Sequence, residues 1–206
     1  MNPHTPQETL TELGQEFIDA FYHAVYGAQD DYERFREFEP MWAATYTQRL
    51  KANFLHERIW GRILPYVEEN EDIDAIDKEP VRVLNIGTKF ALRIKRHSDK
   101  DLISSFRTKG AIDFYGGTIP IDGMERVGLA IGYRWDPTID KITAPVISLQ
   151  DLKKKKTVWS VELLAEEASQ TPNIVPRVID APETQLELSV GFRQEIEKEQ
   201  TGEEEA

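Results

Sequence analysis

The sequence predicts an α+β fold, in which N-terminal helices pack on an antiparallel sheet of about four to six strands. Two observations lead to this class. Apolar residues recur at helical spacing up to about residue 67, whereas beyond residue 80 they alternate with polar residues in short runs. Helical and strand-like segments do not alternate along the chain, which argues against a parallel, doubly wound sheet. We expect a single domain over residues 1–166, made of a helical part (1–67) and a sheet part (80–166).

Three helices are expected in the first part. Thr5 followed three residues later by Glu8 is the pattern of a capping box, and apolar residues then recur at helical spacing until Gly27, the expected stop. A short second helix is expected over about residues 30–38. A longer third helix is expected over about residues 42–66, where apolar side chains again form one stripe.

The middle of the chain is expected to change from loop to strands. Residues 68–79 hold seven acids and one lysine without an apolar period, which predicts an exposed loop. The segments 81–86 and 89–97 are rich in alternating and β-branched residues around a Gly-Thr pair, and they predict a hairpin. Residues 98–108 are polar and predict a loop, and residues 111–115 are expected to form a short strand.

The sheet is expected to continue as an antiparallel meander, after which the pattern loosens. The predicted strands of the meander are 127–135, 142–149 and 157–164. Residues 167–206 begin as a linker punctuated by prolines, and within them residues 185–192 alternate once more and could dock on a sheet edge or on a partner. The tail from Glu195 carries six glutamates and one lysine, a composition typical of a disordered acidic segment.

Composition excludes several classes of protein. The chain has no cysteine, so it has no disulfide, no thiol nucleophile and no cysteine-ligated metal, and it fits a reducing compartment. No segment approaches about 18 uninterrupted apolar residues, and no secretory signal is visible, so we expect a cytoplasmic protein without a membrane span. A formal net charge of -12 argues against coating nucleic acid with the whole surface, so any contact with a polyanion must be local.

The candidate working surface is a basic stripe within this acidic chain. Seven lysines and arginines lie from Lys89 to Lys109, against two acids. In the predicted strand 89–97 most cations share one parity and the apolar residues the other, so we expect the cations to point away from the core. A purely structural interpretation also fits, because a charged edge strand blocks aggregation or the acidic residues 68–79 neutralise the stripe. The predicted ligand-binding residues are Lys89, Arg93, Lys95, Arg96, His97, Arg107, Lys109 and Arg134.

These features favour a non-enzymatic, cytoplasmic binding or regulatory protein. Its basic sheet surface is expected to contact a phosphate-bearing ligand, a nucleic acid or an acidic protein partner, with an affinity that depends on salt. Phe106, Tyr115 and Tyr133 are the candidates for stacking on the bases of a single strand.

Two alternatives stay open. A magnesium-dependent nuclease needs carboxylates and a lysine that converge, and the candidates are Glu57, Asp113, Asp151 and Lys153. A protein inhibitor or antitoxin-like subunit would depend instead on residues 167–206.

Other catalytic or metal sites are poorly supported, and no cofactor is expected. His56-Glu57 begins like the helix of a zinc protease, but Trp60 stands where the second histidine ligand belongs. His97, Asp101 and Ser104 are close enough in sequence to suggest a triad, but a polar loop explains them more simply.

Overall fold

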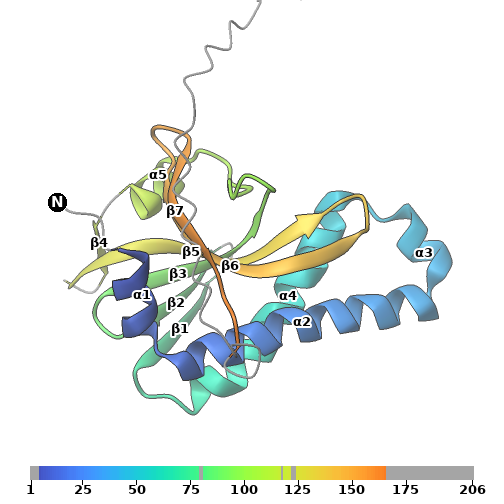
Figure 1. The fold of residues 1–206 in the computed structure, drawn as a ribbon, viewed down its shortest axis with the longest axis horizontal. Coiled ribbons are helices and arrows are strands. Elements are labelled where there is room, and N and C mark those ends of the chain that lie inside the picture. The colour runs from blue at the N-terminus through green and yellow to red at the C-terminus, as the bar shows by residue number, and fades with distance from the viewer. Residues whose placement is uncertain (1–4, 79–80, 117, 122–123, 166–206) are drawn as a thin grey trace, which may run out of the picture.

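The computed structural model describes residues 5–78, 81–116, 118–121 and 124–165, and the α+β class is confirmed (Figure 1). The predictions for residues 166–206, including the strand at 185–192 and the acidic tail, fall outside the described residues. The helices are α1 (Pro6–Leu13), α2 (Gln15–Phe38), α3 (Pro40–Thr45), α4 (Gln48–Glu68) and α5 (Lys109–Tyr115). The strands are β1 (Ile73–Lys78), β2 (Val81–Ile86), β3 (Phe90–His97), β4 (Thr118–Ile121), β5 (Met124–Asp136), β6 (Lys141–Asp151) and β7 (Lys156–Glu162).

The sheet is mixed, although most of its strand pairs are antiparallel as predicted. Its order is β1-β2-β3-β5-β6-β7, and the short β4 pairs with the start of β5. The predicted hairpin β2–β3 and meander β5–β6–β7 are confirmed. β3 and β5 run parallel, from Phe90 opposite Val127 to His97 opposite Arg134. Parallel neighbours need a crossover connection, and here the loop 98–108 and α5 supply it.

The two faces of the sheet carry different layers (Figure 1). α2 and α4 pack together on one face, where Phe21, Ile63 and Leu92 belong to the larger core cluster of buried residues. α5 lies on the other face, where Phe114 packs with Ala130 in a smaller cluster. The fold therefore buries both faces of β3 and β5, and this burial determines which of their side chains reach solvent.

The predicted helix boundaries need two corrections. The expected stop at Gly27 is wrong, because α2 continues as one helix through residues 30–38. Gly27 instead lets α4 come close, since an added Cβ would lie 2.7 Å from Nη1 of Arg62. Hydrogen bonds from Arg62 and then from Arg58 lower the pKa of Asp31 to about 2, and they hold α2 and α4 together at this crossing.

The predicted third helix is two helices, separated between Thr45 and Gln48. Thr47 accepts a hydrogen bond from the backbone N–H of Leu50 and caps α4, a start signal that the apolar stripe conceals. The capping box of Thr5 and Glu8 at the start of α1 is confirmed.

Two predictions of local structure are wrong. Residues 68–79 are not a loop throughout, because β1 forms the edge of the sheet there, and charged side chains are common on edge strands. Residues 111–115 are helical rather than extended. The Thr108 side chain accepts from the N–H of Ala111, and the buried residues of α5 are spaced as on one face of a helix.

None of the described helices is long and apolar enough to cross a lipid bilayer.

Gly128→Ala tests how closely α5 packs on the sheet, and Gly61→Ala on α4 serves as the comparison. A Cβ at Gly128 of β5 would overlap the carbonyl oxygen of Phe114, so Gly128→Ala is expected to lower the free energy of unfolding by about 1–3 kcal/mol. Gly61→Ala on α4 meets nothing within 4 Å and is expected to raise it by about 0.5–1 kcal/mol. Urea unfolding followed by tryptophan fluorescence measures both, and a Gly128→Ala variant as stable as the parent would contradict this packing.

Candidate functional site

The alternation predicted along β3 is confirmed, but its basic face is not open to water. Phe90, Leu92 and Ile94 are buried in the core beneath the helices. Arg93 points to the opposite face, where its guanidinium carbon lies 3.8 Å from the ring centroid of Phe114 on α5. The expectation that this face is free is therefore wrong at Arg93, because α5 covers it.

Lys89 and Arg134, two of the predicted ligand-binding residues, pair with acids of the protein itself. The Lys89 amine forms an ion pair with Glu12 of α1. Arg134 shares its guanidinium between Asp101 and Glu162. Neither cation is available without breaking an internal contact.

Three further cations of the stripe are half-buried. Burial, and then the neighbouring charge of Arg93, lowers the pKa of the Lys95 amine. Arg93, Lys95 and Arg96 form no ion pair within the described residues, so the acidic segment 68–79 does not neutralise them there. These three cations are half-buried along β3 and do not form a fully open surface.

His97, also predicted to bind a ligand, is buried, with only 1% of its surface exposed. Its Nε2 lies 2.8 Å from Oγ of Ser148, which also accepts a hydrogen bond from the side-chain amide of Gln150. Burial lowers the pKa of His97 to about 4, so the imidazole is neutral near pH 7. The placement of His97 on an exposed face is wrong, and Ser148, which is fully buried, is not an accessible nucleophile.

Asp101 fastens the loop 98–108 to β5, β6 and β7. Its carboxylate accepts hydrogen bonds from Arg134 at 2.7 and 2.9 Å and from Oγ of Ser160 at 2.7 Å. Its backbone carbonyl accepts from the side chains of Gln150 and Thr157. Asp101 is 1% exposed and has a φ of 56°, so the loop is held firmly.

The triad suggested by sequence proximity does not form. Ser104 is exposed and contributes its backbone N–H to the carbonyl of Arg96. His97 and Asp101 pair instead with Ser148 and Ser160, two buried hydroxyls from distant strands.

The second half of the loop lies beside the turn between β6 and β7. Nη2 of Arg107 donates a hydrogen bond to the carbonyl of Lys153 at 3.3 Å. An added Cβ at Gly116, after α5, would lie 3.6 Å from Cε of Lys153. The loop, the start of α5 and the turn therefore form one continuous end of the molecule.

Seven exposed cations belong to the loop, the start of α5 and the turn, and we call this end of the molecule the basic end. Within the described residues, none of the seven forms an ion pair. The basic end comprises Lys100, Arg107, Lys109, Lys153, Lys154, Lys155 and Lys156.

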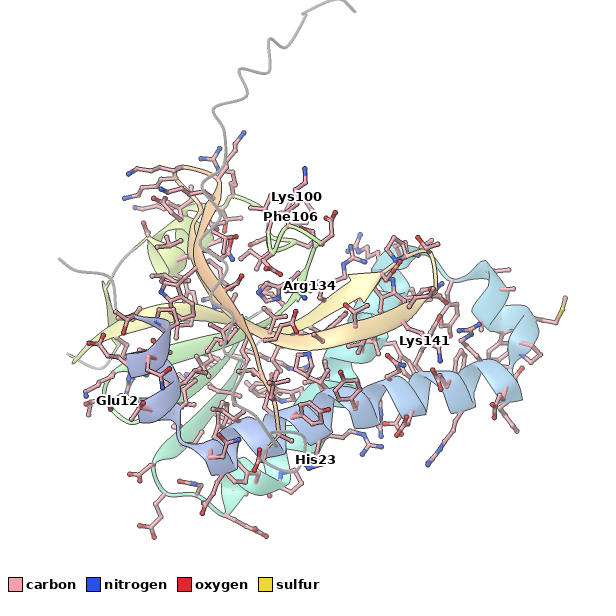
Figure 2. All side chains as sticks on the ribbon, viewed as in Figure 1. Glu12, His23, Lys100, Phe106, Arg134 and Lys141 are labelled. Atoms are coloured by element: carbon pink, nitrogen blue, oxygen red, sulfur yellow. The ribbon has the colours of Figure 1, made fainter. Side chains whose placement is uncertain are left out.

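Phe106 is the one predicted stacking residue that reaches solvent. It is 90% exposed, and it lies near Lys100 in the loop (Figure 2). Tyr115 and Tyr133 are 2% and 1% exposed, so their predicted contact with bases is wrong. The arrangement at the basic end, an exposed ring and cations that form no ion pair within the described residues, suits a flexible polyanion with planar bases.

The four residues of the nuclease hypothesis do not converge. Glu57 lies on α4 and binds Arg82, on the opposite side of the sheet from α5, which carries the exposed Asp113. Asp151 accepts a hydrogen bond from the backbone N–H of Lys154, and the Lys153 side chain lies near Gly116. No group of three or more histidine, aspartate or glutamate residues in the described chain could hold a metal ion.

Sequence reasoning missed the lysine run 153–156 as part of the site. The run is visible in the sequence, but it resembles an ordinary hairpin tip until its neighbour is known. That neighbour, the loop with Phe106 and Arg107, is about 50 residues away in the chain, and only the contacts of Asp101 and Arg107 bring the two together.

Comparison with protein-family models, with curated proteins and with solved structures gives no match to this chain.

Acid is expected to destabilise the fold through His97. Its pKa is about 4 in the folded protein and 6.5 without burial, so at intermediate pH the unfolded chain binds more protons and stability falls as the pH falls. The loss amounts to about 2 kcal/mol between about pH 7.5 and pH 5. Urea unfolding at both pH values should show this loss, and His97→Gln should reduce it, whereas His23→Gln at an exposed histidine should not. An unchanged pH dependence in His97→Gln would contradict a buried, neutral imidazole.

Proposed function

We propose that the protein is a non-enzymatic binding protein that contacts single-stranded nucleic acid through the basic end and Phe106. The supporting observation is the exposed Phe106 ring among cations that form no ion pair within the described residues. Cations follow the phosphates of a flexible strand, and an aromatic ring stacks on its bases without regard to sequence.

The backbone of the β6–β7 turn supports a functional role for its lysines. Lys155 has a φ of 53°, in the left-handed region that glycine or asparagine adopts with less strain. A lysine in this conformation costs about 1 kcal/mol. A turn selected for stability alone would favour another residue, and this supports a role in binding for the charge of Lys155.

The remainder of the chain limits the kind of binding. A net charge of -12 repels a polyanion everywhere except at the basic end, so the contact is short and depends strongly on salt. If about four of the seven cations reach phosphates, the slope of log K against log salt is about -3 for a single strand. The cysteine-free composition supports a cytoplasmic location for this activity.

The stacking role of Phe106 can be tested with a fluorescein-labelled oligonucleotide of mixed sequence. In anisotropy titrations, Phe106→Ala is expected to raise the Kd by about 5-fold to 150-fold, because loss of one base–aromatic stack costs about 1–3 kcal/mol. Phe38→Ala, at an equally prominent ring on α2 that is 81% exposed, is the matched control and should leave the Kd unchanged.

Lys155→Asn tests whether the charge at this position of the β6–β7 turn serves binding rather than the stability of the fold. Asparagine tolerates the left-handed conformation, so the free energy of unfolding should stay equal or rise by up to about 1 kcal/mol. The Kd should rise about threefold to tenfold, and the salt slope should become shallower by about 0.7. Arg49→Gln, which removes an exposed cation of α4, is the control for charge alone.

Certain outcomes would contradict the proposal. Binding that is independent of salt, or that both Phe106→Ala and Lys155→Asn leave intact, would exclude the basic end as the contact surface. Competition by polyglutamate as strong as by nucleic acid, with no effect of Phe106→Ala, would assign this surface to an acidic protein partner.

A further inference from the structure

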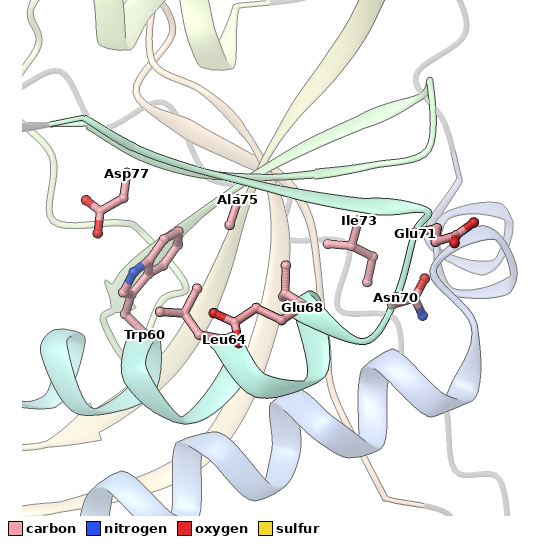
Figure 3. Close-up of a pocket in the computed structure, with 9 residues that line it drawn as sticks. Trp60, Leu64, Glu68, Asn70, Glu71, Ile73, Ala75 and Asp77 are labelled. Atoms are coloured by element: carbon pink, nitrogen blue, oxygen red, sulfur yellow. The ribbon is translucent and has the colours of Figure 1, made fainter.

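A groove separates the C-terminal half of α4 from β1, at the edge of the sheet (Figure 3). Its volume is about 470 Å³. Side chains of Ile73 and Ala75 extend from β1 toward those of Trp60 and Leu64 on α4, and these four supply the apolar part of a lining that is otherwise polar. A surface groove that combines apolar contacts with a few polar groups is a common feature of recognition sites.

The groove runs along an open strand edge. β1 is the first strand in the sheet order and pairs with β2 along its whole length, from Ile73 opposite Ile86 to Lys78 opposite Val81. No strand of the described residues pairs with its other edge. Unpaired backbone N–H and C=O groups on such an edge are a template for another strand.

The groove and the open edge of β1 are placed so that one added strand would use both. Alternate residues of β1, namely Ile73, Ala75 and Asp77, line the groove. A strand added beside β1 would follow the same period of two, so every second side chain would enter the groove. The indole Nε1 of Trp60, which also lines the groove, is buried and has no hydrogen-bond acceptor within the described residues.

The charge around the groove determines the character of that segment. Glu68 and Glu71 line the rim and form no ion pair within the described residues, whereas Asp77 is paired with Arg82. Residues 68–78 contain six acids against a single lysine. Lysine or arginine side chains on the partner complement this rim.

We propose that an extended, basic segment of a protein partner binds this groove and adds to the sheet as a strand beside β1. Its apolar side chains enter the groove, and its cations meet Glu68 and Glu71. β1 spans six residues, which matches a bound segment of about 20 Å.

The charges argue against two other occupants. A second copy of β1 beside the first would bring acids such as Asp74 and Asp77 against acids. The alternating segment of this chain, residues 185–192, carries one glutamate and no cation, so it lacks the complementary charge. A basic partner chain fits better than either.

The experiment uses the full-length protein and a labelled, capped hexapeptide that alternates lysine or arginine with valine. Titration by anisotropy is expected to give saturable binding, and NMR is expected to shift the amide resonances of residues 73–78. A peptide with N-methyl groups at alternate positions keeps the side chains but loses backbone donors, and it should bind at least tenfold more weakly. A glutamate–valine peptide should not bind.

Substitutions on the protein test the rim without disturbing the core. The double variant Glu68→Lys with Glu71→Lys should weaken binding of the basic peptide at least tenfold. Glu37→Lys, at an exposed acid on α2, is the matched control and should leave the Kd unchanged. Both N-methylation and the rim variant must weaken binding for the proposal to stand.

Several results would overturn it. Equal binding of the N-methylated peptide would mean that the basic peptide merely adheres to an acidic chain. No binding of the basic peptide would leave the edge without the proposed partner. Dimers of the protein alone that the double variant dissociates, seen by sedimentation, would show that a second copy occupies the edge. Since the groove and the basic end share no residue, failure here would not affect the nucleic-acid proposal.

Discussion

The buried carboxylate of Asp101 determines where the candidate site lies, because its hydrogen bonds fix the loop 98–108 against the sheet. Its bonds to Arg134 and Ser160 join segments 33 and 59 residues apart in the chain. A carboxylate without partners in this position would be strongly unfavourable, so the ion pair and the hydroxyl are both needed once the loop is folded down. Because Asp101 is fixed over β6 and β7, Phe106 and Arg107 are brought beside the lysine turn 153–156. The contacts of Asp101 and the hydrogen bond from Arg107 to Lys153 together fix how the two halves of the basic end lie.

The two faces of the sheet are held by different forces. On the helical face, side chains such as Phe21, Ile63 and Leu92 exclude water, and the burial of apolar surface does most of the stabilising. On the other face His97, Ser148 and Asp101 form a buried polar network whose hydrogen bonds fix direction. Such networks are sensitive to the loss of any member, but they specify one arrangement. Directional bonding of this kind suits a face that must present a loop in one orientation.

Local chemistry made the fold class and the alternation of β3 predictable from sequence. The capping box at Thr5 and the parity of β3 depend only on neighbours along the chain, and both are correct. Whether Arg93 is exposed depends instead on α5, whose helical character is signalled by the cap at Thr108 rather than by its apolar pattern. β1 was not predicted for a different reason. An edge strand with one apolar face can be as acidic as a loop, so the sequence indicated a loop there. The basic end was half predicted: Arg107 and Lys109 came from the stripe, and the lysines of the turn required contacts between residues far apart in the chain.

The acids along β1 and the lysines of the β6–β7 turn lie at opposite ends of the strand order. This separation of opposite charges contributes an electric dipole across the described part of the molecule. In the field of a polyanion the dipole experiences a torque that turns the lysine turn forward before contact, although the net charge of -12 opposes approach. In the proposed complex with a nucleic acid, the same orientation would leave the β1 edge accessible to a second macromolecule.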